Sequence, residues 1–276
     1  MRAVGSIVWA QAGSLTAIDT DVTDSLAGLG DDPVGVCRTA QGLVMLPDLA
    51  AGFGIPENRQ DERSIRSASD VLRRLLALDG SPLVEAREPD RRVVGTCRHF
   101  ALLSCAFLRH RGIAARVRCG FAGYFEARRW LDHWVTEYLD DTGRWVRIDS
   151  EILGFDYVDR PEDLAAGEFL TGGEAWTFLR ETGVDPMHFG VDGAPHAWGI
   201  GEVRGNAIRD LAALNKVEML PWDEWGRMDA SYKGETGEEF DALITHVAEA
   251  CASNDESTIR QTYLHEDLAV PEALLA

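Results

Sequence analysis

Hydrophobic residues recur at helical spacing in two stretches of the first half of the chain. From Ser64 to Leu78 they stand three and four positions apart, which predicts an amphipathic helix that Asp79-Gly80 ends. From Cys97 to Arg111 the apolar residues of 100–108 cover nearly the whole circumference of a helix, a pattern typical of a helix buried on all sides. Gly112 follows as a natural C-terminal cap.

Between these helices and residue 150 the pattern changes to the alternation of strands. Residues 113–124 alternate apolar and polar positions, and two further strands, 133–139 and 144–149, flank the turn signal Asp140-Asp141-Thr142-Gly143. If Gly143 takes the left-handed position of a three-residue turn, Glu137 faces Arg147. The same register places Val135 opposite Asp149, so His133 and Asp149 become diagonal neighbours on one face.

The flanks carry weaker patterns. Gly, Pro and Asp with short apolar runs, among them Ser6–Ala10 and 42–46, predict short strands and loops for residues 1–62. After residue 155 the pattern is mainly helical, with helices expected over 174–182, 206–220 and 238–252. We therefore expect an α+β core at 63–155, an N-terminal part at 1–62 packed on it, and a helical C-terminal region at 156–276.

Composition narrows the class of partner. Of the 276 residues 45% are hydrophobic, which suits a globular protein, and the net charge of -19 repels phosphate backbones and anionic lipid surfaces. We therefore expect no nucleic-acid partner, and no stretch approaches the ~20 apolar residues that cross a bilayer. Lys216 and Lys233 are the two lysines beside many arginines, a bias that hints at a bacterial source.

The five cysteines are an odd number without paired short spacings, so the sequence predicts neither a disulfide framework nor a Cys-x-x-Cys zinc site. Reduced thiols favour a cytoplasmic location. A weakly apolar run after Arg2 resembles a signal peptide only faintly, because Gly5 and Ser6 interrupt it.

One of these cysteines stands where a thiol nucleophile would be activated. Cys97 falls in the first turn of the buried helix, where unpaired backbone N–H groups and the helix dipole stabilise a thiolate. The same N–H groups can bind the oxyanion that forms when a thiolate adds to a carbonyl, and Gly95 lets a substrate approach. A base held by a third group is also needed, and His133 with Asp149 can provide both on the predicted hairpin.

Three blocks resemble the transglutaminase-like superfamily, relatives of papain-type thiol enzymes. They are Gly95-Thr96-Cys97-Arg98-His99-Phe100-Ala101 with the strand after it, then His133-Trp134-Val135-Thr136-Glu137-Tyr138, then Gly143-Arg144-Trp145-Val146-Arg147-Ile148-Asp149. The resemblance covers residues 64–152 and implies a papain-like core with Cys97 as nucleophile, His133 as base and Asp149 as its orienter. Ser150-Glu151 departs from the Pro that the family often has after its Asp.

The resemblance implies attack on an amide carbonyl without a cofactor or a metal, through a thioester on Cys97. Water would make the protein an amide hydrolase acting on an amide- or peptide-containing substrate, and an amine acceptor would make it an amide-forming transferase in a biosynthetic pathway. A catalytically silent binding module on the same fold is the third alternative. The sequence leaves the oligomeric state open.

Several other polar residues have an ordinary structural interpretation beside a functional one. His99 points away from Cys97 round the helix, so a Cys-x-His metal pair is not expected. His188 and His196 lack ligand spacing. Asn58 and Gln60 are two candidates for a side-chain oxyanion donor, and neither is assigned. The polar residues of 206–225 either line a cleft or belong to helix packing.

Overall fold

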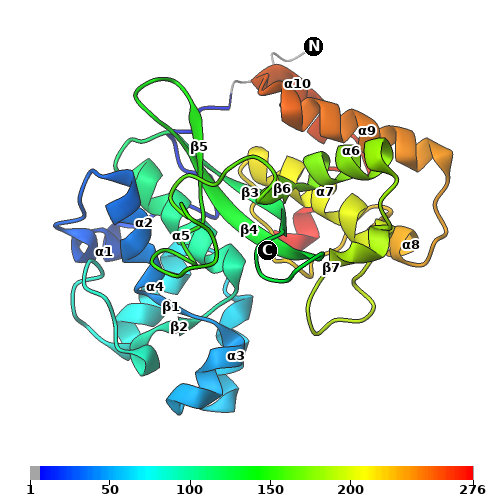
Figure 1. Cartoon of the computed structure of the whole chain (residues 1–276). Coiled ribbons are helices and arrows are strands. Elements are labelled where there is room, and N and C mark those ends of the chain that lie inside the picture. The colour runs from blue at the N-terminus through cyan, green and yellow to red at the C-terminus, as the bar shows by residue number, and fades with distance from the viewer. Residues whose placement is uncertain (1–6, 276) are drawn as a thin grey trace. The chain divides into compact units, whose positions relative to one another are not determined.

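The computed structural model describes residues 7–275 (Figure 1). The chain forms two compact units, each built from separate segments. One comprises Val8–Val117 and Val135–Leu164 and is called the Cys97 unit below. The other contains Arg118–Trp134 and the chain from Ala165 onward and is called the His133 unit. The run that resembles a signal peptide lies largely outside the described residues.

The Cys97 unit is mostly helical before residue 111. Its helices are α1 (Thr20–Thr23), α2 (Pro33–Gln41), α3 (Pro47–Ala50), α4 (Ala68–Leu78) and α5 (Cys97–His110), and α2 packs against α5 (Figure 1). Two short strands, β1 (Val44–Met45) and β2 (Val93–Val94), pair in parallel.

The expectation of strands and loops at the N-terminus was wrong for most of this region. Residues 7–10 form no strand, and α2 replaces the loop expected at 33–41. The Asp32 carboxylate accepts from the Gly35 N–H at 2.7 Å, and Pro33 occupies the first turn, so both start signals of a helix are present. The apolar run at 42–46 does contain a strand, β1.

Helix α4 begins later than the hydrophobic stripe suggested. Its first residue is Ala68, because Ser67 accepts from the Asp70 N–H at 3.1 Å and so caps the helix there. The residues before it, Glu57–Ser64, form a 3-10 helix.

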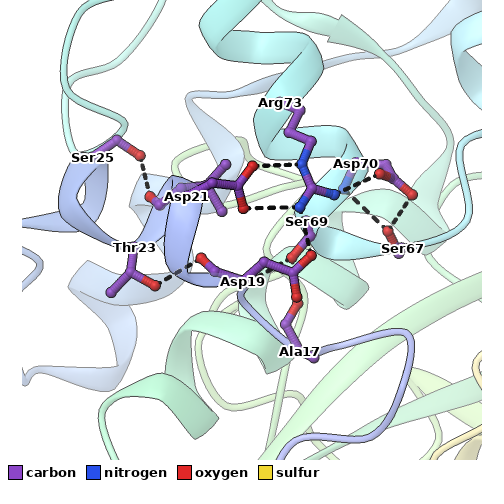
Figure 2. A network of polar contacts seen from close by, with 10 residues as sticks. Ala17, Asp19, Asp21, Thr23, Ser25, Ser67, Ser69, Asp70 and Arg73 are labelled. Atoms are coloured by element: carbon purple, nitrogen blue, oxygen red, sulfur yellow. Dashed lines mark hydrogen bonds and ion pairs between the residues drawn. The ribbon is translucent and has the colours of Figure 1, made fainter.

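An exposed cluster of charges ties the start of the chain to α4. The Arg73 guanidinium on α4 binds Asp21 at 2.8 Å, Asp19 at 2.6 Å and Asp70 at 2.9 Å (Figure 2). Asp19 and Asp21 flank the first residue of α1. Ser69 of α4 adds two hydrogen bonds to this segment, to the Ala17 carbonyl and from the Asp19 N–H.

Five strands form the main sheet. They are β3 (Ala115–Ala122), β4 (Trp130–Leu139), β5 (Trp145–Ile148), β6 (Phe169–Thr171) and β7 (Phe189–Gly190). The order is β5-β4-β3-β6, with β7 pairing in parallel with β4, whereas β4–β5 and β3–β6 are antiparallel. The expected α+β class is confirmed as a mixture of helices and an antiparallel sheet.

The hairpin between β4 and β5 has the predicted register. Glu137 pairs with Arg147, Tyr138 with Val146 and Leu139 with Trp145. Gly143 has a φ of 83°, the left-handed conformation that the three-residue turn requires. The Asp140 carboxylate closes the turn by accepting from the N–H groups of Thr142 and Arg144, each at 2.9 Å.

The His133 unit contains the C-terminal helices. They are α6 (Gly172–Thr182), α7 (Ile200–Leu214), α8 (Met228–Tyr232), α9 (Glu238–Ser253) and α10 (Glu256–Tyr263), and α6, α7 and α9 pack against one another (Figure 1). Helices α6 and α9 lie where the sequence predicted them.

Helix α7 differs from its prediction at both ends. It begins at Ile200 rather than Asn206 and ends at Leu214 rather than 220, because Lys216 adopts a positive φ of 63°. Every residue from Gly201 to Leu214 is buried. Its polar residues lie among buried partners, so the chain shows no apolar stripe from which the helix boundaries could be read.

Candidate active site

Cys97 is the first residue of α5, as the sequence predicted. The chain reaches it through β2, where the Val93 N–H donates to the Leu43 carbonyl at 3.0 Å and the Gly95 N–H to the Met45 carbonyl at 2.9 Å. A Cβ on Gly95 would lie 2.8 Å from His99 Cγ and 3.0 Å from a Val44 methyl. Glycine is therefore needed here for close packing against α5.

His99 locks the start of α5. Its Nδ1 accepts from the Thr96 N–H at 3.1 Å, and its Nε2 lies 3.0 Å from the Ile65 carbonyl, which assigns the proton to Nε2. The ring is completely buried. Burial, reinforced by the neighbouring Arg98 charge, lowers the pKa of His99 to about 3, although the bond to Ile65 opposes this. His99 is thus a neutral structural cap, in agreement with the role expected from its helix position.

A buried carboxylate stabilises the residues that lead into α5. Glu62 accepts from the Val94 N–H at 2.9 Å and from Arg59 at 2.7 Å, and Arg74 lies at 2.7 Å. Burial acts to raise the pKa of Glu62, but these hydrogen bonds and charges outweigh it and lower the pKa. The charged carboxylate fixes β2, and with it the residues that lead into Cys97.

Cys97 differs from the other cysteines in its exposure. It is partly exposed, whereas Cys37, Cys105, Cys119 and Cys251 are buried. Burial raises the pKa of the Cys37 thiol to about 12 and raises that of Cys119 strongly. The buried thiols have the properties of core residues, as expected for Cys105, and Cys97 is the thiol that a substrate can reach.

His133 lies on β4 among aromatic rings of its own unit. The ring centroids of Phe125, Tyr124 and Phe169 are 5.0, 6.2 and 6.4 Å from that of the imidazole, and all three rings stand edge-on to it. His133 is 2% exposed. These rings restrict the rotation of the imidazole and shield it from water.

Asp149 directly follows β5 and is 1% exposed. Its Oδ1 accepts from the Glu151 N–H at 3.0 Å, and its own N–H donates to the Pro161 carbonyl at 2.9 Å. The loop after it is held by Gln41 of α2, whose amide donates to the Glu151 and Leu153 carbonyls at 3.1 and 2.9 Å. The departure Ser150-Glu151 therefore occurs in an ordered loop.

The three predicted residues divide between the units. Cys97 and Asp149 belong to the Cys97 unit, and His133 lies in the His133 unit, two residues before β4 continues into the other. Within the Cys97 unit, the Thr136 hydroxyl of β4 donates to the Ala101 carbonyl at 3.0 Å, so β4 contacts α5 one turn after Cys97.

A polar network lies next to His133 that the sequence analysis did not predict. Asp132 of β4 contacts Asn206 of α7, which also binds Arg209, and Arg118 of β3 pairs with Asp210 at 2.8 Å. Asn206, Arg209 and Asp210 belong to the dense polar run at 206–225, and their contacts hold α7 to the strands. An aspartate adjacent to a candidate histidine was the available signal.

The other candidate residues lie in 3-10 helices and a loop. His188 belongs to a 3-10 helix and His196 to a loop. Among residues 7–275, no group of three or more His, Cys, Asp and Glu side chains is placed to hold a metal ion. Gln60 donates to the Pro47 carbonyl at 3.1 Å, and Asn58 is exposed. Within the same range, no helix is long and apolar enough to cross a membrane.

Comparison with known proteins bears on residues 79–150. No curated protein matches the chain. A solved structure, "a Putative Cysteine Protease from Cytophaga hutchinsonii", matches at 19% identity and a TM-score of 0.20, over 51% of this chain and 46% of that one. The chain thus spans under half the length of that protein. Residues 79–150 match the family model of the transglutaminase-like superfamily, so this segment, which contains Cys97, His133 and Asp149, is a transglutaminase-like segment, as the resemblance predicted.

Proposed function

We propose that the chain is a cysteine-dependent amide hydrolase that forms a thioester on Cys97. The observation that carries the proposal is the placement of Cys97, a partly exposed thiol at the first position of a helix whose next twelve residues are buried. The positive end of the helix dipole at such a position favours a thiolate and a developing oxyanion. The transglutaminase-like match over 79–150 supports a cysteine-dependent enzyme.

His133 is the proposed base and acid. It takes the Cys97 proton, and the thiolate adds to the amide carbonyl carbon. The C–N bond then breaks as the imidazolium gives its proton to the departing amine, which leaves a thioester. Water, deprotonated by the imidazole, attacks the thioester carbon, and the C–S bond breaks to release the acid and the thiolate.

Asp149 is the proposed orienter of the imidazole. The pairing of Thr136 with Ile148 has the register from which the sequence analysis predicted this role, and it supports the proposal. A carboxylate at this place accepts from one ring nitrogen and leaves the other for sulfur. The restricted imidazole rotation described above serves the same end.

Alkylation of Cys97 tests the proposal without a known substrate. Iodoacetamide modification of the folded protein, located by mass spectrometry, is measured from pH 5 to 9, with Cys97→Ser as the control for the buried thiols. We expect an apparent thiol pKa well below the ordinary value of ~8.5, and its return toward that value in His133→Gln. A wild-type thiol that titrates like a free exposed cysteine would contradict the enzyme and favour a silent binding module.

The choice between hydrolysis and amide formation needs a trapped acyl-enzyme. Acylation of Cys97 with an activated ester, followed by water alone or water with added amines, measures the partition of the thioester. The hydrolase predicts free acid as the main product at millimolar amine. Predominant amide under the same conditions would support the transferase instead.

A further inference from the structure

In the His133 unit, six buried or partly buried polar side chains form a cluster that includes Asp132, the residue before His133. They come from two strands and two helices, and they are Asp132 of β4, Cys119 of β3, Glu202, Asn206 and Arg209 of α7, and Tyr232 of α8. The proposed reaction uses none of them. Their spacing along the chain is long, so only the fold brings them together.

Asn206 is the centre of this cluster and is completely buried. Its amide nitrogen donates to Asp132 Oδ1 at 2.8 Å and to the Gly120 carbonyl at 3.1 Å. Its amide oxygen accepts from Arg209 Nη1 at 3.0 Å and from the Cys119 thiol at 3.3 Å. Both donors and both acceptor sites are in use, so a single side chain joins β3, β4 and α7.

The backbone around Asn206 has been brought unusually close. A Cβ on Gly172, the first residue of α6, would lie 2.2 Å from the Asn206 carbonyl carbon. A Cβ on Gly120 would lie 2.0 Å from the Leu170 carbonyl oxygen of β6. Neither position accepts any other residue without a backbone shift, so α6 packs closely on α7 at Asn206, and β6 packs closely on β3 at Gly120.

Arg209, which donates to Asn206, is itself bound to a carboxyl group. Arg209 binds Glu202 at 3.1 Å, and the other oxygen of Glu202 accepts from the Tyr232 hydroxyl at 2.7 Å. Beside this chain, Asp210 binds the Arg118 guanidinium at 2.8 Å and accepts from the Cys119 N–H at 3.0 Å. Helix α7 is therefore bonded to β3 at three adjacent residues and to β4 at Asp132.

We propose that Asn206 is a positioning residue for His133. It binds Asp132, the residue before His133 on β4, and so holds the backbone in the place that puts the imidazole among its aromatic neighbours. The inference rests on the proposed function, since a fixed imidazole matters for a proton shuttle. Its physical content, the position of a ring, is measurable without a substrate.

The charges around Asp132 add a second effect to the positioning. The charged or titratable groups that interact with it are Arg209 and Glu202 from α7, Cys119 from β3 and His133 on its own strand. Burial raises the pKa values of Asp132 and Glu202, that of Glu202 to about 7, while the Arg209 charge opposes both rises. A charged Asp132 and a protonated His133 stabilise each other.

The experiment follows the His133 ring by NMR. Wild type and variants carry labelled histidine, and the resonances of His133 among the seven histidines are identified by their loss in His133→Gln. Ring currents of Tyr124 and Phe125 make these resonances sensitive to small movements. The rate of Cys97 alkylation across pH is recorded in parallel.

Three variants separate position from charge. Asn206→Ala and Asp132→Ala each remove the link and are expected to shift the His133 resonances and to move the pH midpoint of Cys97 alkylation upward, toward that of an ordinary thiol. Asp132→Asn keeps an acceptor for Asn206, so the resonances stay near their wild-type positions although the charge of Asp132 is removed. This conservative rescue is not expected of a merely destabilising change.

The matched control is Asp241→Asn on α9. Asp241 binds Arg204 on α7, two residues from Asn206, but lies away from the strands. It is expected to lower stability without moving the His133 resonances. If Asn206→Ala does not fold, Asp132→Ala decides the matter at a partly exposed position.

Unchanged His133 resonances and an unchanged alkylation profile in a folded Asn206→Ala or Asp132→Ala would overturn the inference. A displaced ring in these variants, together with a wild-type Cys97 that shows no activation, would instead support the inference and refute the proposed function. The two failures are therefore distinguishable in one set of samples.

Discussion

Glu137 on β4 and Arg147 on β5 face each other across the hairpin, and Arg147 Nη2 lies 2.9 Å from Glu137 Oε1. The other oxygen of Glu137 lies 2.7 Å from Arg116 Nε on β3. The guanidinium of Arg116 stacks on Trp145 with 4.0 Å between its carbon and the ring centroid. The Glu137 carboxylate on β4 thus binds side chains of both β5 and β3.

Glu137→Ala is expected to destabilise the protein by about 3 kcal/mol or more, because it leaves the Arg116 guanidinium, 2% exposed, without this carboxylate. Urea unfolding measures the change. Arg144→Ala removes a more exposed pair with Asp163 and serves as the control. An equally small effect in both variants would show that the buried pair does not hold the hairpin.

His99 predicts how stability depends on pH. Its folded pKa of about 3 is below the unfolded value of 6.5, so only the unfolded state binds this proton between those values. Stability should therefore fall as pH drops below 6.5, with a contribution of up to about 1.4 kcal/mol per pH unit. Unfolding at pH 5 and 7.5 is compared in wild type and His99→Gln, where the contribution is absent. His110→Gln, at the exposed end of α5, should keep it.

Glu202 predicts the opposite slope in an overlapping range. Burial raises its pKa to about 7 from 4.5, so the folded state prefers the neutral carboxyl. This contribution is fully present below pH 4.5 and is lost as pH rises to 7. Glu202→Gln should therefore gain stability relative to wild type as pH increases through this range. Exposed Glu249→Gln is the control, and parallel pH curves for wild type and Glu202→Gln would contradict the assignment.

The Arg73 cluster in Figure 2 predicts a contribution that salt removes. Arg73 and its partners Asp19, Asp21 and Asp70 are exposed, so their attraction is screened by ions. Arg73→Gln should lower stability at low ionic strength and leave it unchanged in ~1 M NaCl, where the screening length is only ~3 Å. Thermal unfolding at both salt concentrations tests this, and a loss that persists in high salt would indicate packing rather than charge.

Gly143 predicts how much the turn contributes. Its φ of 83° is strained for any residue with a side chain, so Gly143→Ala should cost about 1 kcal/mol of stability. Gly30→Ala is the matched control, because a Cβ there meets open space without a positive φ. Equal stability of the two variants would mean that the hairpin tolerates another turn, and with it another register.

The features that the sequence predicted well are those decided by neighbours in the chain. Helix α5 follows from an apolar run with Gly112 after it, and the hairpin from a short turn whose left-handed Gly143 sets the register. Local rules also placed α6 and α9, but they missed α2, whose signals are a cap and a proline rather than a hydrophobic stripe. The transglutaminase-like segment at 79–150 was recognisable because its motifs are contiguous.

Only the tertiary structure decided what surrounds His133. Asn206 reaches Asp132 across 74 residues and Gly120 across 86, and no local pattern encodes such a distance. The boundaries of α7 were predicted wrongly for the same reason. Its buried polar residues form hydrogen bonds with strands that are distant in the chain. Periodicity and caps are properties of adjacent residues, whereas buried hydrogen bonds need partners that folding alone brings within reach.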